Sequence, residues 1–143
     1  MSALPVLGWR EWLALPALGI AAIRVKVDTG ARSSALHVEA QQCFWRDERE
    51  WVRFVLATGA PGVDTQSVEA PVVDRRRVTD SGGNSGERVF IRTAFAIAGQ
   101  QFEAEVNLAQ RRNMLFPMLL GRTAMAGRFL VDPDASFLWG DPP

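Results

Sequence analysis

Alternating apolar and polar positions predict two clear β-strands in this chain. From residue 23 to residue 28, apolar residues occupy every odd position and charged residues every even one. This period of two is typical of a strand that packs one face against a core. The stretch from Gln101 to Leu108 alternates in the same way, and a turn signal at Gly99-Gln100 precedes it. We therefore expect a hairpin that joins this stretch to the strand before the turn, Arg88 to Ile97.

Shorter apolar runs between turn signals complete the predicted fold. The turn signals are the Gly-rich and Pro-rich stretches at residues 58–62 and 80–86. Further strands are predicted at Trp51–Leu56, Val68–Val73 and Arg128–Val131, and one short helix begins near Arg122 and ends by Gly127. Within the second of these strands, Pro71 indicates an edge position. Together the patterns predict an all-β fold, a small closed barrel with one short C-terminal helix.

The apolar stretch from Leu13 to Ile23 is the one segment that raises the question of a membrane anchor or a secretory signal. It is too short to span a bilayer as a helix, and Pro16 and Gly19 interrupt it. A signal peptide would need a positive n-region, but the first charge, Arg10, is followed at once by an acidic residue. We interpret the stretch as part of the fold and expect a cytoplasmic protein that does not enter a membrane.

Composition limits the kind of partner that the protein can recognise. With 143 residues and 48% hydrophobic content, the chain is long enough for one core, and we expect a single domain over residues 1–143. Basic and acidic residues number 16 each, so there is no net charge to attract nucleic acid or an anionic membrane. Recognition by charge must therefore be local. Cys43 is the only cysteine, which excludes an intrachain disulfide.

The tripeptide Asp28-Thr29-Gly30 closes the first predicted strand. Aspartic proteases keep their catalytic carboxylate in this tripeptide, although a bare Asp-Thr-Gly also suits an ordinary turn. Lys26 shares a strand face with Asp28, at about 6.6 Å along the backbone, so its charge can bias the environment of the carboxylate. It is the only lysine of the chain, and His37 is the only histidine.

A second motif supports the protease interpretation. Residues 118–122, Met-Leu-Leu-Gly-Arg, form an apolar strand that ends in Gly-Arg and leads into the short helix. This chain resembles the retropepsin class, in which such a strand follows the catalytic triplet late in the chain, after a flap-like hairpin. The stretches 8–12, 26–37 and 116–122 narrow the resemblance to the bacterial RimB-type family, long labelled an ATP-dependent zinc protease.

The resemblance implies a retropepsin-like fold and an aspartic endopeptidase activity. In the broader retropepsin class the catalytic triplet corresponds to Asp28, Thr29 and Gly30, and Arg122 corresponds to an arginine that braces the active-site loop. For the RimB-type family, the implied substrate is an oligoglutamate tail of the kind that a partner ligase, RimK, adds to a ribosomal protein. Peptide hydrolysis by carboxylates needs two of them. Because Asp132 and Asp134 lack the following Thr/Ser-Gly and indicate a terminal turn, we expect the second Asp28 from a homodimer.

The older zinc and ATP labels do not fit the residues. One histidine, one cysteine and the lack of a His-Glu-x-x-His motif argue against a zinc site. The Gly-rich stretch at 82–86 contains no lysine that would reach a phosphate. We therefore expect no metal and no cofactor. A zinc-dependent protease remains a third hypothesis, to be tested with chelators.

Positive charge near the triplet is the independent sign of an acidic substrate. Arginine suits carboxylates because its planar fork binds both oxygens. Arg92 lies in or beside the predicted flap region, as does the run Arg75-Arg76-Arg77, which is open to two interpretations, substrate contacts or a solvated surface. The alternative function is a dimeric, non-catalytic module that binds acidic peptides, with Asp28 serving only as a turn. As substrate-binding residues we predict Lys26, Arg32, Ser33, His37 and Arg88.

Overall fold

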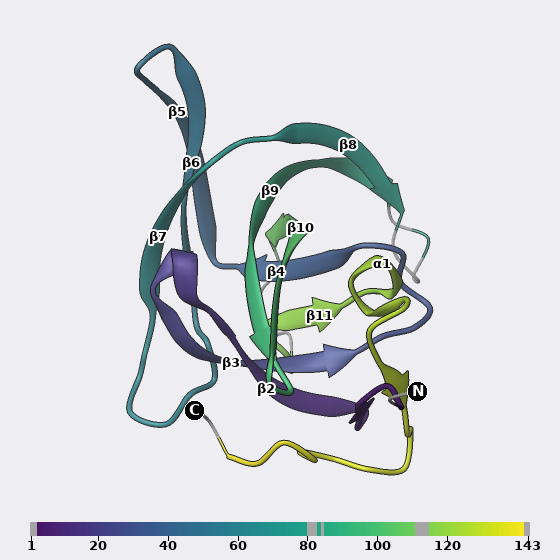
Figure 1. Cartoon of the computed structure of the whole chain (residues 1–143). Helices are drawn as coiled ribbons and strands as arrows, with labels where there is room; N and C mark the ends of the chain where they lie inside the picture. The colour runs from purple at the N-terminus through teal and green to yellow at the C-terminus, as the bar shows by residue number, and fades with distance from the viewer. Residues whose placement is uncertain (1–2, 80–82, 84, 111–114, 142–143) are drawn as a thin grey trace.

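The computed structural model describes residues 3–79, 83, 85–110 and 115–141. Nearly all of its regular structure is β-strand (Figure 1), with one short 3-10 helix at Pro16–Leu18 and one α-helix. The elements in chain order are β1 (Val6–Leu7), β2 (Arg10–Leu15), β3 (Ile20–Val27), β4 (Ser34–Val38), β5 (Ala40–Arg46), β6 (Arg49–Leu56), β7 (Gln66–Pro71), β8 (Asp74–Thr79), β9 (Ser85–Ile97), β10 (Gln100–Gln110), β11 (Met118–Leu120), α1 (Arg122–Met125) and β12 (Leu130–Val131).

The largest sheet contains the strands that lead into the Asp-Thr-Gly triplet and into the Gly-Arg pair. Its strand order is β10-β4-β11-β3-β2-β9-β8, and β9 also pairs with β10. Strands β3 and β11 run parallel, with Val25 opposite Met118 and Val27 opposite Leu120. Parallel strands end at the same edge of a sheet. The residues that follow them, Asp28 and Gly121, are therefore brought together although they lie far apart in the sequence.

The prediction of an all-β fold with one short C-terminal helix is confirmed, but the sheets do not close into a true barrel. The cycle of pairings around the large sheet depends on a single residue pair between β2 and β9, Ala14 with Ala96. The register of β2 shifts between Leu13 and Leu15, and the 3-10 helix begins directly afterwards. The single pair with β9 therefore lies within this irregular part of β2. Strands β5, β6 and β7 form a separate sheet, and β1 and β12 form another.

The predicted hairpin and helix are confirmed. Strands β9 and β10 pair from Ile97 opposite Gln100, and the connecting residues Ala98 and Gly99 both have positive φ, 54° and 74°, as a type I′ turn requires. Helix α1 begins at Arg122, as predicted. Strand β7 lies at the edge of its sheet, in agreement with the presence of Pro71. Residues 80–82 and 84 of the predicted 80–86 turn lie outside the described residues.

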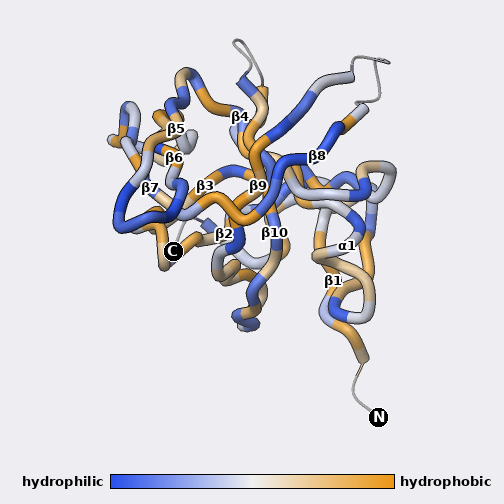
Figure 2. The backbone as a smooth tube through the Cα atoms, turned by 90° about the horizontal axis from the view of Figure 1, so that it is seen from above, coloured by the Kyte–Doolittle hydropathy of each residue, from blue (hydrophilic) through white to orange (hydrophobic). Residues whose placement is uncertain are grey.

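The core lies between the large sheet and the sheet of β5, β6 and β7. Its largest fully buried side chains are Phe54, Phe90 and Phe95. The outer part of the β5–β6 hairpin extends beyond this core (Figure 1), and there Trp45 is 72% exposed. Strand β8 is hydrophilic along most of its length (Figure 2). Within the described ranges, no helix has the length and apolar character needed to cross a membrane.

The segment 13–23 is part of the fold, as expected, and the strand before it holds a buried carboxylate. Glu11 on β2 is 0% exposed. Its Oε2 accepts hydrogen bonds from the backbone N–H groups of Gly8 (2.7 Å) and Leu138 (3.1 Å), and its Oε1 accepts one from Trp139 (3.4 Å). One side chain thereby fastens the C-terminal segment against the N-terminal one.

Replacing Glu11 with alanine should destabilise the protein by about 3 kcal/mol, because buried donors that lose their acceptor cost about 1–3 kcal/mol each. For a chain of this size, that loss lowers the melting temperature by roughly 6–12 °C. Thermal unfolding followed by circular dichroism measures it. Glu11→Gln, which keeps an acceptor oxygen, is the control and should lose less. An alanine variant that melts like the wild type would contradict this role.

Candidate active site

The loop after β3 is built around one oxygen of Asp28. Its Oδ1 accepts hydrogen bonds from the N–H groups of Gly30 (3.0 Å) and Ala31 (3.2 Å), while its backbone N–H donates to the carbonyl of Leu120 (2.9 Å). The side chain is half-buried. No hydrogen bond from the described part of the chain reaches Oδ2. The carboxylate is therefore oriented by the backbone through one oxygen, and its second oxygen remains available for chemistry.

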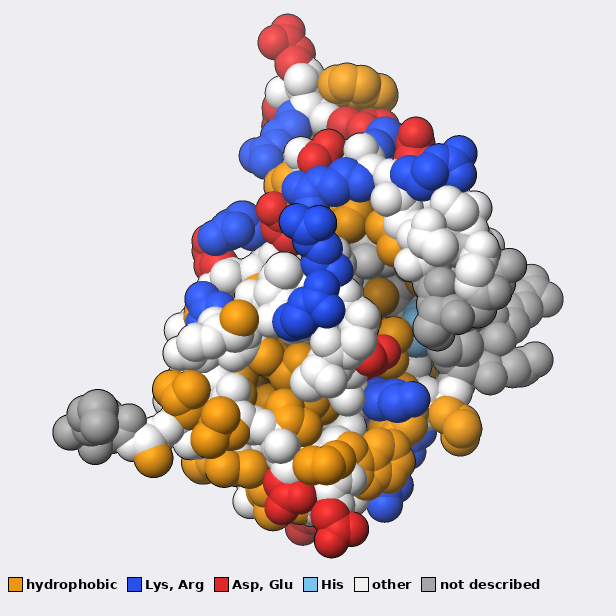
Figure 3. Space-filling view, turned by 90° about the vertical axis from the view of Figure 1, so that its right-hand side faces the viewer, with side chains coloured by type: hydrophobic (Ala, Val, Ile, Leu, Met, Phe, Trp, Pro, Cys, Tyr) orange, Lys and Arg blue, Asp and Glu red, His pale blue; other side chains and the backbone are white. Residues whose placement is uncertain are grey.

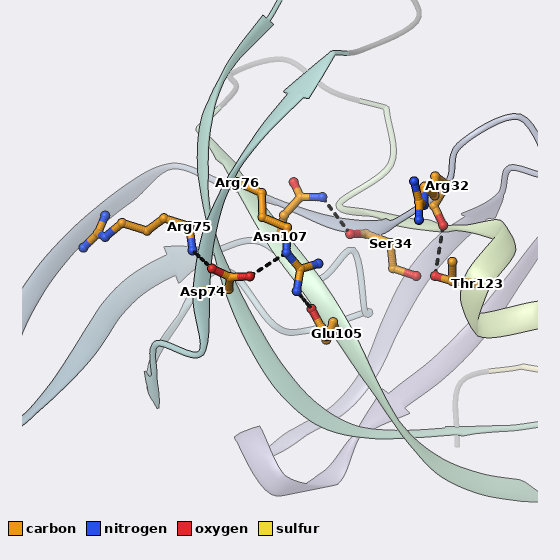
Figure 4. Close-up of polar contacts among 8 residues, drawn as sticks. All are labelled: Arg32, Ser34, Asp74, Arg75, Arg76, Glu105, Asn107 and Thr123. Carbon is orange, nitrogen blue, oxygen red and sulfur yellow. Dashed lines mark hydrogen bonds and ion pairs between the residues drawn. The ribbon is translucent and has the colours of Figure 1, made fainter.

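The start of α1 holds this loop from the other side. The N–H of Arg122 donates to the carbonyl of Ala31 (2.7 Å), and its guanidinium lies 3.4 Å from the carbonyl of Thr29. Thr123 donates to the carbonyl of Arg32 through both its N–H (3.1 Å) and its hydroxyl (2.9 Å; Figure 4). These bonds tie the triplet loop to the Gly-Arg motif, which agrees with the bracing role expected for Arg122.

A buried amide connects the site to β9. Asn107 on β10 is 2% exposed; its side-chain N–H donates to the carbonyl of Ser34 (3.0 Å; Figure 4), and its Oδ1 accepts from the guanidinium of Arg88 (3.2 Å). The Ser34 hydroxyl in turn accepts from the N–H of Gly121 (3.0 Å). Sequence reasoning missed Asn107 and Ser34, because their partners are distant in sequence and no local pattern marks them.

The predicted substrate-binding residues occupy different environments. Lys26 and Arg32 are exposed, Ser33 and Arg88 are half-buried, and His37 is buried at 7% exposure. The Nδ1 of His37 lies 2.6 Å from the carbonyl oxygen of Phe116. Lys26, Arg32 and Arg88 make no ion pair with a carboxylate in the described chain. No described carboxylate neutralises these three cations, although Arg88 already donates to Asn107, whereas the position of His37 favours a structural role.

The arginine run on β8 is largely neutralised by neighbouring acids. Arg75 pairs with Glu50, and Arg76 lies between Asp74 (2.7 Å) and Glu105 (2.6 Å; Figure 4). The hydrogen bond from Arg76 lowers the pKa of Asp74. In the upper part of the face drawn in Figure 3, acidic side chains lie among the Lys and Arg side chains. The structure therefore favours the second interpretation of the run, a surface that pairs with its own carboxylates.

The residues around the loop provide neither a metal site nor a second catalytic acid. Among the residues that the structure describes, no group of three or more His, Cys, Asp and Glu side chains is arranged to hold a metal ion. Asp132 accepts a hydrogen bond from the N–H of Asp134 (2.9 Å), as in the terminal turn predicted for this segment. In its described part, a single chain thus presents one carboxylate, Asp28, on a braced loop.

Comparison with known proteins identifies related sequences and a related structure. The model of the RimB-like family, described as retropepsin-like aspartic endopeptidase RimB, matches residues 6–142. A probable alpha-L-glutamate ligase from Shewanella pealeana is 39% identical over 140 residues, which are 95% of this chain and 30% of that protein. Another from Desulfotalea psychrophila is 40% identical over 131 residues, 90% of this chain and 28% of the relative.

The chain therefore spans about 30% of the length of the curated relatives that it matches. A crystal structure of a protein of unknown function from Legionella pneumophila has a TM-score of 0.76 at 24% identity, covering 94% of this chain and 97% of that one. At this identity the structural match establishes a shared fold.

Proposed function

The chain belongs to the RimB-like family of retropepsin-like aspartic endopeptidases, and from this premise we propose that it hydrolyses α-linked glutamate chains with a dyad of two Asp28 side chains. The observation that carries the proposal is the braced Asp28 loop, in which the backbone orients one carboxylate oxygen. A lone carboxylate cannot serve as both the acid and the base of peptide hydrolysis. The site therefore requires a second copy of the chain.

An apolar surface supports association of two copies. Leu4 and Val6 are each 37% exposed, and Leu130 on β12 is 55% exposed. Strands β1 and β12 form a sheet of two strands. The outward carbonyl of Val6 on β1 accepts a hydrogen bond from the Trp139 indole (2.8 Å), so β12 is the edge that we propose to pair with another chain. Figure 3 shows hydrophobic side chains gathered over the lower half of the face on the side of β12. Twofold pairing along this surface is the arrangement that we propose to bring the two Asp28 loops together.

The proposed reaction uses one proton shared between the two carboxylates. The charged Asp28 accepts a proton from water as the water oxygen attacks the peptide carbonyl carbon, and the protonated Asp28 gives its proton to the carbonyl oxygen. The tetrahedral intermediate then collapses. Its C–N bond breaks as the nitrogen receives the proton that the first Asp28 took from water, and a hydroxyl proton of the intermediate returns to the other Asp28. This releases a carboxylic acid and an amine and restores the shared proton of the dyad. In this scheme Thr29 and Gly30 hold the loops, and Gly30 permits close approach.

The available cations support an acidic substrate. Lys26, Arg32 and Arg88 lie on or beside the elements that carry the site, and we assign the recognition of substrate carboxylates to them and to Ser33. The relatives named probable alpha-L-glutamate ligase carry a segment similar to this chain within a longer protein. A cytoplasmic pairing with a RimK-type ligase, whose glutamate tails on a ribosomal protein this chain would shorten, is the cellular role that we propose.

The proposal is tested by mass spectrometry of α-linked polyglutamate incubated with the protein. We expect shortened glutamate chains with the wild type, with and without a chelator, and intact chains with Asp28→Asn. Poly-aspartate and polylysine of equal length are the substrate controls. Activity that a chelator abolishes would favour the zinc hypothesis. Tight binding of polyglutamate by both the wild type and Asp28→Asn, without cleavage by either, would favour the non-catalytic module.

A further inference from the structure

Two cations face each other on the outer side of the β2–β3 hairpin. Arg10 on β2 and Lys26 on β3 are direct partners in the ladder. Like charges at directly opposite positions destabilise a sheet. Because strand side chains alternate, Arg24 lies on the same face as Lys26. We call the three side chains, Arg10, Arg24 and Lys26, the basic rail.

No acid of the described chain neutralises the basic rail. The ion pairs in the described chain involve other cations, Arg46, Arg53, Arg75, Arg76 and Arg92. Glu11, next to Arg10 in sequence, is on the opposite, buried side of β2 and accepts only backbone N–H groups. In a chain with zero net charge, the rail is thus a local excess of positive charge.

Aromatic rings fix two of these cations without neutralising them. The guanidinium of Arg10 lies 4.7 Å from the ring centre of Trp9 and 4.9 Å from that of Phe137, and its Nε donates to the Ser136 hydroxyl (3.3 Å). Arg24 lies 5.2 Å from the ring centre of Phe116. Stacking on a ring restrains a guanidinium and leaves its charge in place.

An arginine on the β5–β6 hairpin differs from Arg10 and Arg24, because its charge is neutralised within the fold. Arg53 also stacks on a ring, 5.0 Å from the centre of Phe44, but it is paired with Glu69 at 2.7 Å. Arg10 and Arg24 have the ring without the acid. Each also donates a hydrogen bond to a neutral neighbour, Arg10 to the Ser136 hydroxyl and Arg24 to the Leu115 carbonyl (2.6 Å). Their charge is thus held in position and is not neutralised by a carboxylate of the described chain.

We propose that the basic rail is an extended subsite for an acidic peptide, and that it binds the carboxylates on one side of the cleaved bond. This inference rests on the function proposed above. An extended peptide presents alternate side chains at intervals of about 6.6 Å, the same interval that separates Arg24 from Lys26 on β3, with Asp28 two residues further on, directly after the strand. Every second carboxylate of the ligand can then meet a cation while the scissile bond lies at Asp28. Three cations suit a short acidic peptide better than a nucleic acid, whose binding draws on many phosphate contacts.

The test measures binding separately from hydrolysis. Fluorescence anisotropy of a labelled α-linked hexaglutamate is followed with the full chain carrying Asp28→Asn, at low salt. Adding Lys26→Glu should weaken binding at least about tenfold, because it removes one charge contact and introduces repulsion. Lys26→Arg should bind like the parent. The control is Arg49→Glu, the same loss of a cation at an exposed position on the β5–β6 hairpin, and it should change binding less than about twofold.

A second readout separates recognition from a structural role. Lys26→Glu places an acid directly opposite Arg10, so the melting temperature should stay the same or rise while binding falls. Binding by Lys26→Glu within twofold of the parent, or no binding of hexaglutamate by the parent, would overturn the inference. Tighter binding of an oligothymidine than of hexaglutamate would overturn the assigned ligand.

The rail and the proposed peptidase activity can fail separately. Asp28-dependent cleavage of polyglutamate together with unchanged binding by Lys26→Glu would contradict the proposed subsite and support the peptidase activity. Binding that depends on Lys26, in a protein that does not cleave polyglutamate, would support the subsite and contradict the peptidase activity.

Discussion

Mixing the wild type with an equal amount of Asp28→Asn should reduce hydrolysis to about one quarter of the wild-type rate, since random exchange leaves only a quarter of the dimers with two carboxylates. The pure variant should lose at least about 10³-fold in rate, because it lacks both acid and base. If each chain carried a complete site by itself, the mixture would instead retain one half of the wild-type rate.

The measurement is the initial rate of polyglutamate cleavage across mixing ratios at constant total protein. A squared dependence on the wild-type fraction indicates a site shared between two copies, and a linear dependence contradicts it. Asp47→Asn is the matched control, because Asp47 is exposed and lies in the turn between β5 and β6, in the part of the hairpin that extends beyond the core. Its mixtures should follow the wild type at every ratio.

The elements predicted correctly from sequence are those with a local signal. The stretch at 23–28 and the β9–β10 hairpin alternate because one face of each is packed, and the turn between β9 and β10 is two residues long. Strand β8 was missed for the opposite reason. It is the outermost strand of its sheet, none of its six residues is buried, and its arginines therefore show no period of two. Strand β4 has all five residues buried, which also removes the alternation.

The candidate site likewise has a part that the local sequence predicts and a part that depends on contacts between residues distant in sequence. The triplet is continuous in sequence, so the sequence alone is enough to identify Asp28. The bonds that hold its loop join residues separated by about ninety positions, from Arg122 and Thr123 back to the loop. Likewise, Arg76 has one partner two residues away and another, Glu105, on a different strand. Pairing across strands decides which cations remain available, and a single sequence does not reveal it.

Replacing Gly121 with alanine should destabilise the protein by about 3 kcal/mol or more, through overpacking at the junction of the two motifs. An added Cβ would lie 2.4 Å from the carbonyl carbon of Ser33, 2.6 Å from its oxygen and 2.7 Å from the nitrogen of Ser34. All three are backbone atoms, so no side chain can move aside. The φ of Gly121 is −89°, which any residue adopts, and the effect is therefore steric.

The matched control is Gly86→Ala on β9, where an added Cβ meets no atom within 4 Å. We expect Gly121→Ala to melt at least roughly 6 °C below Gly86→Ala in thermal unfolding. Equal melting temperatures would mean that the β4 and β11 backbones separate at little cost. Below its melting temperature, Gly121→Ala should also cleave polyglutamate more slowly, because the backbone that must yield continues into the loop carrying Asp28. Stability and activity then fall together at this glycine, since the close contact between β4 and β11 that packs the sheet is also what orients the carboxylate.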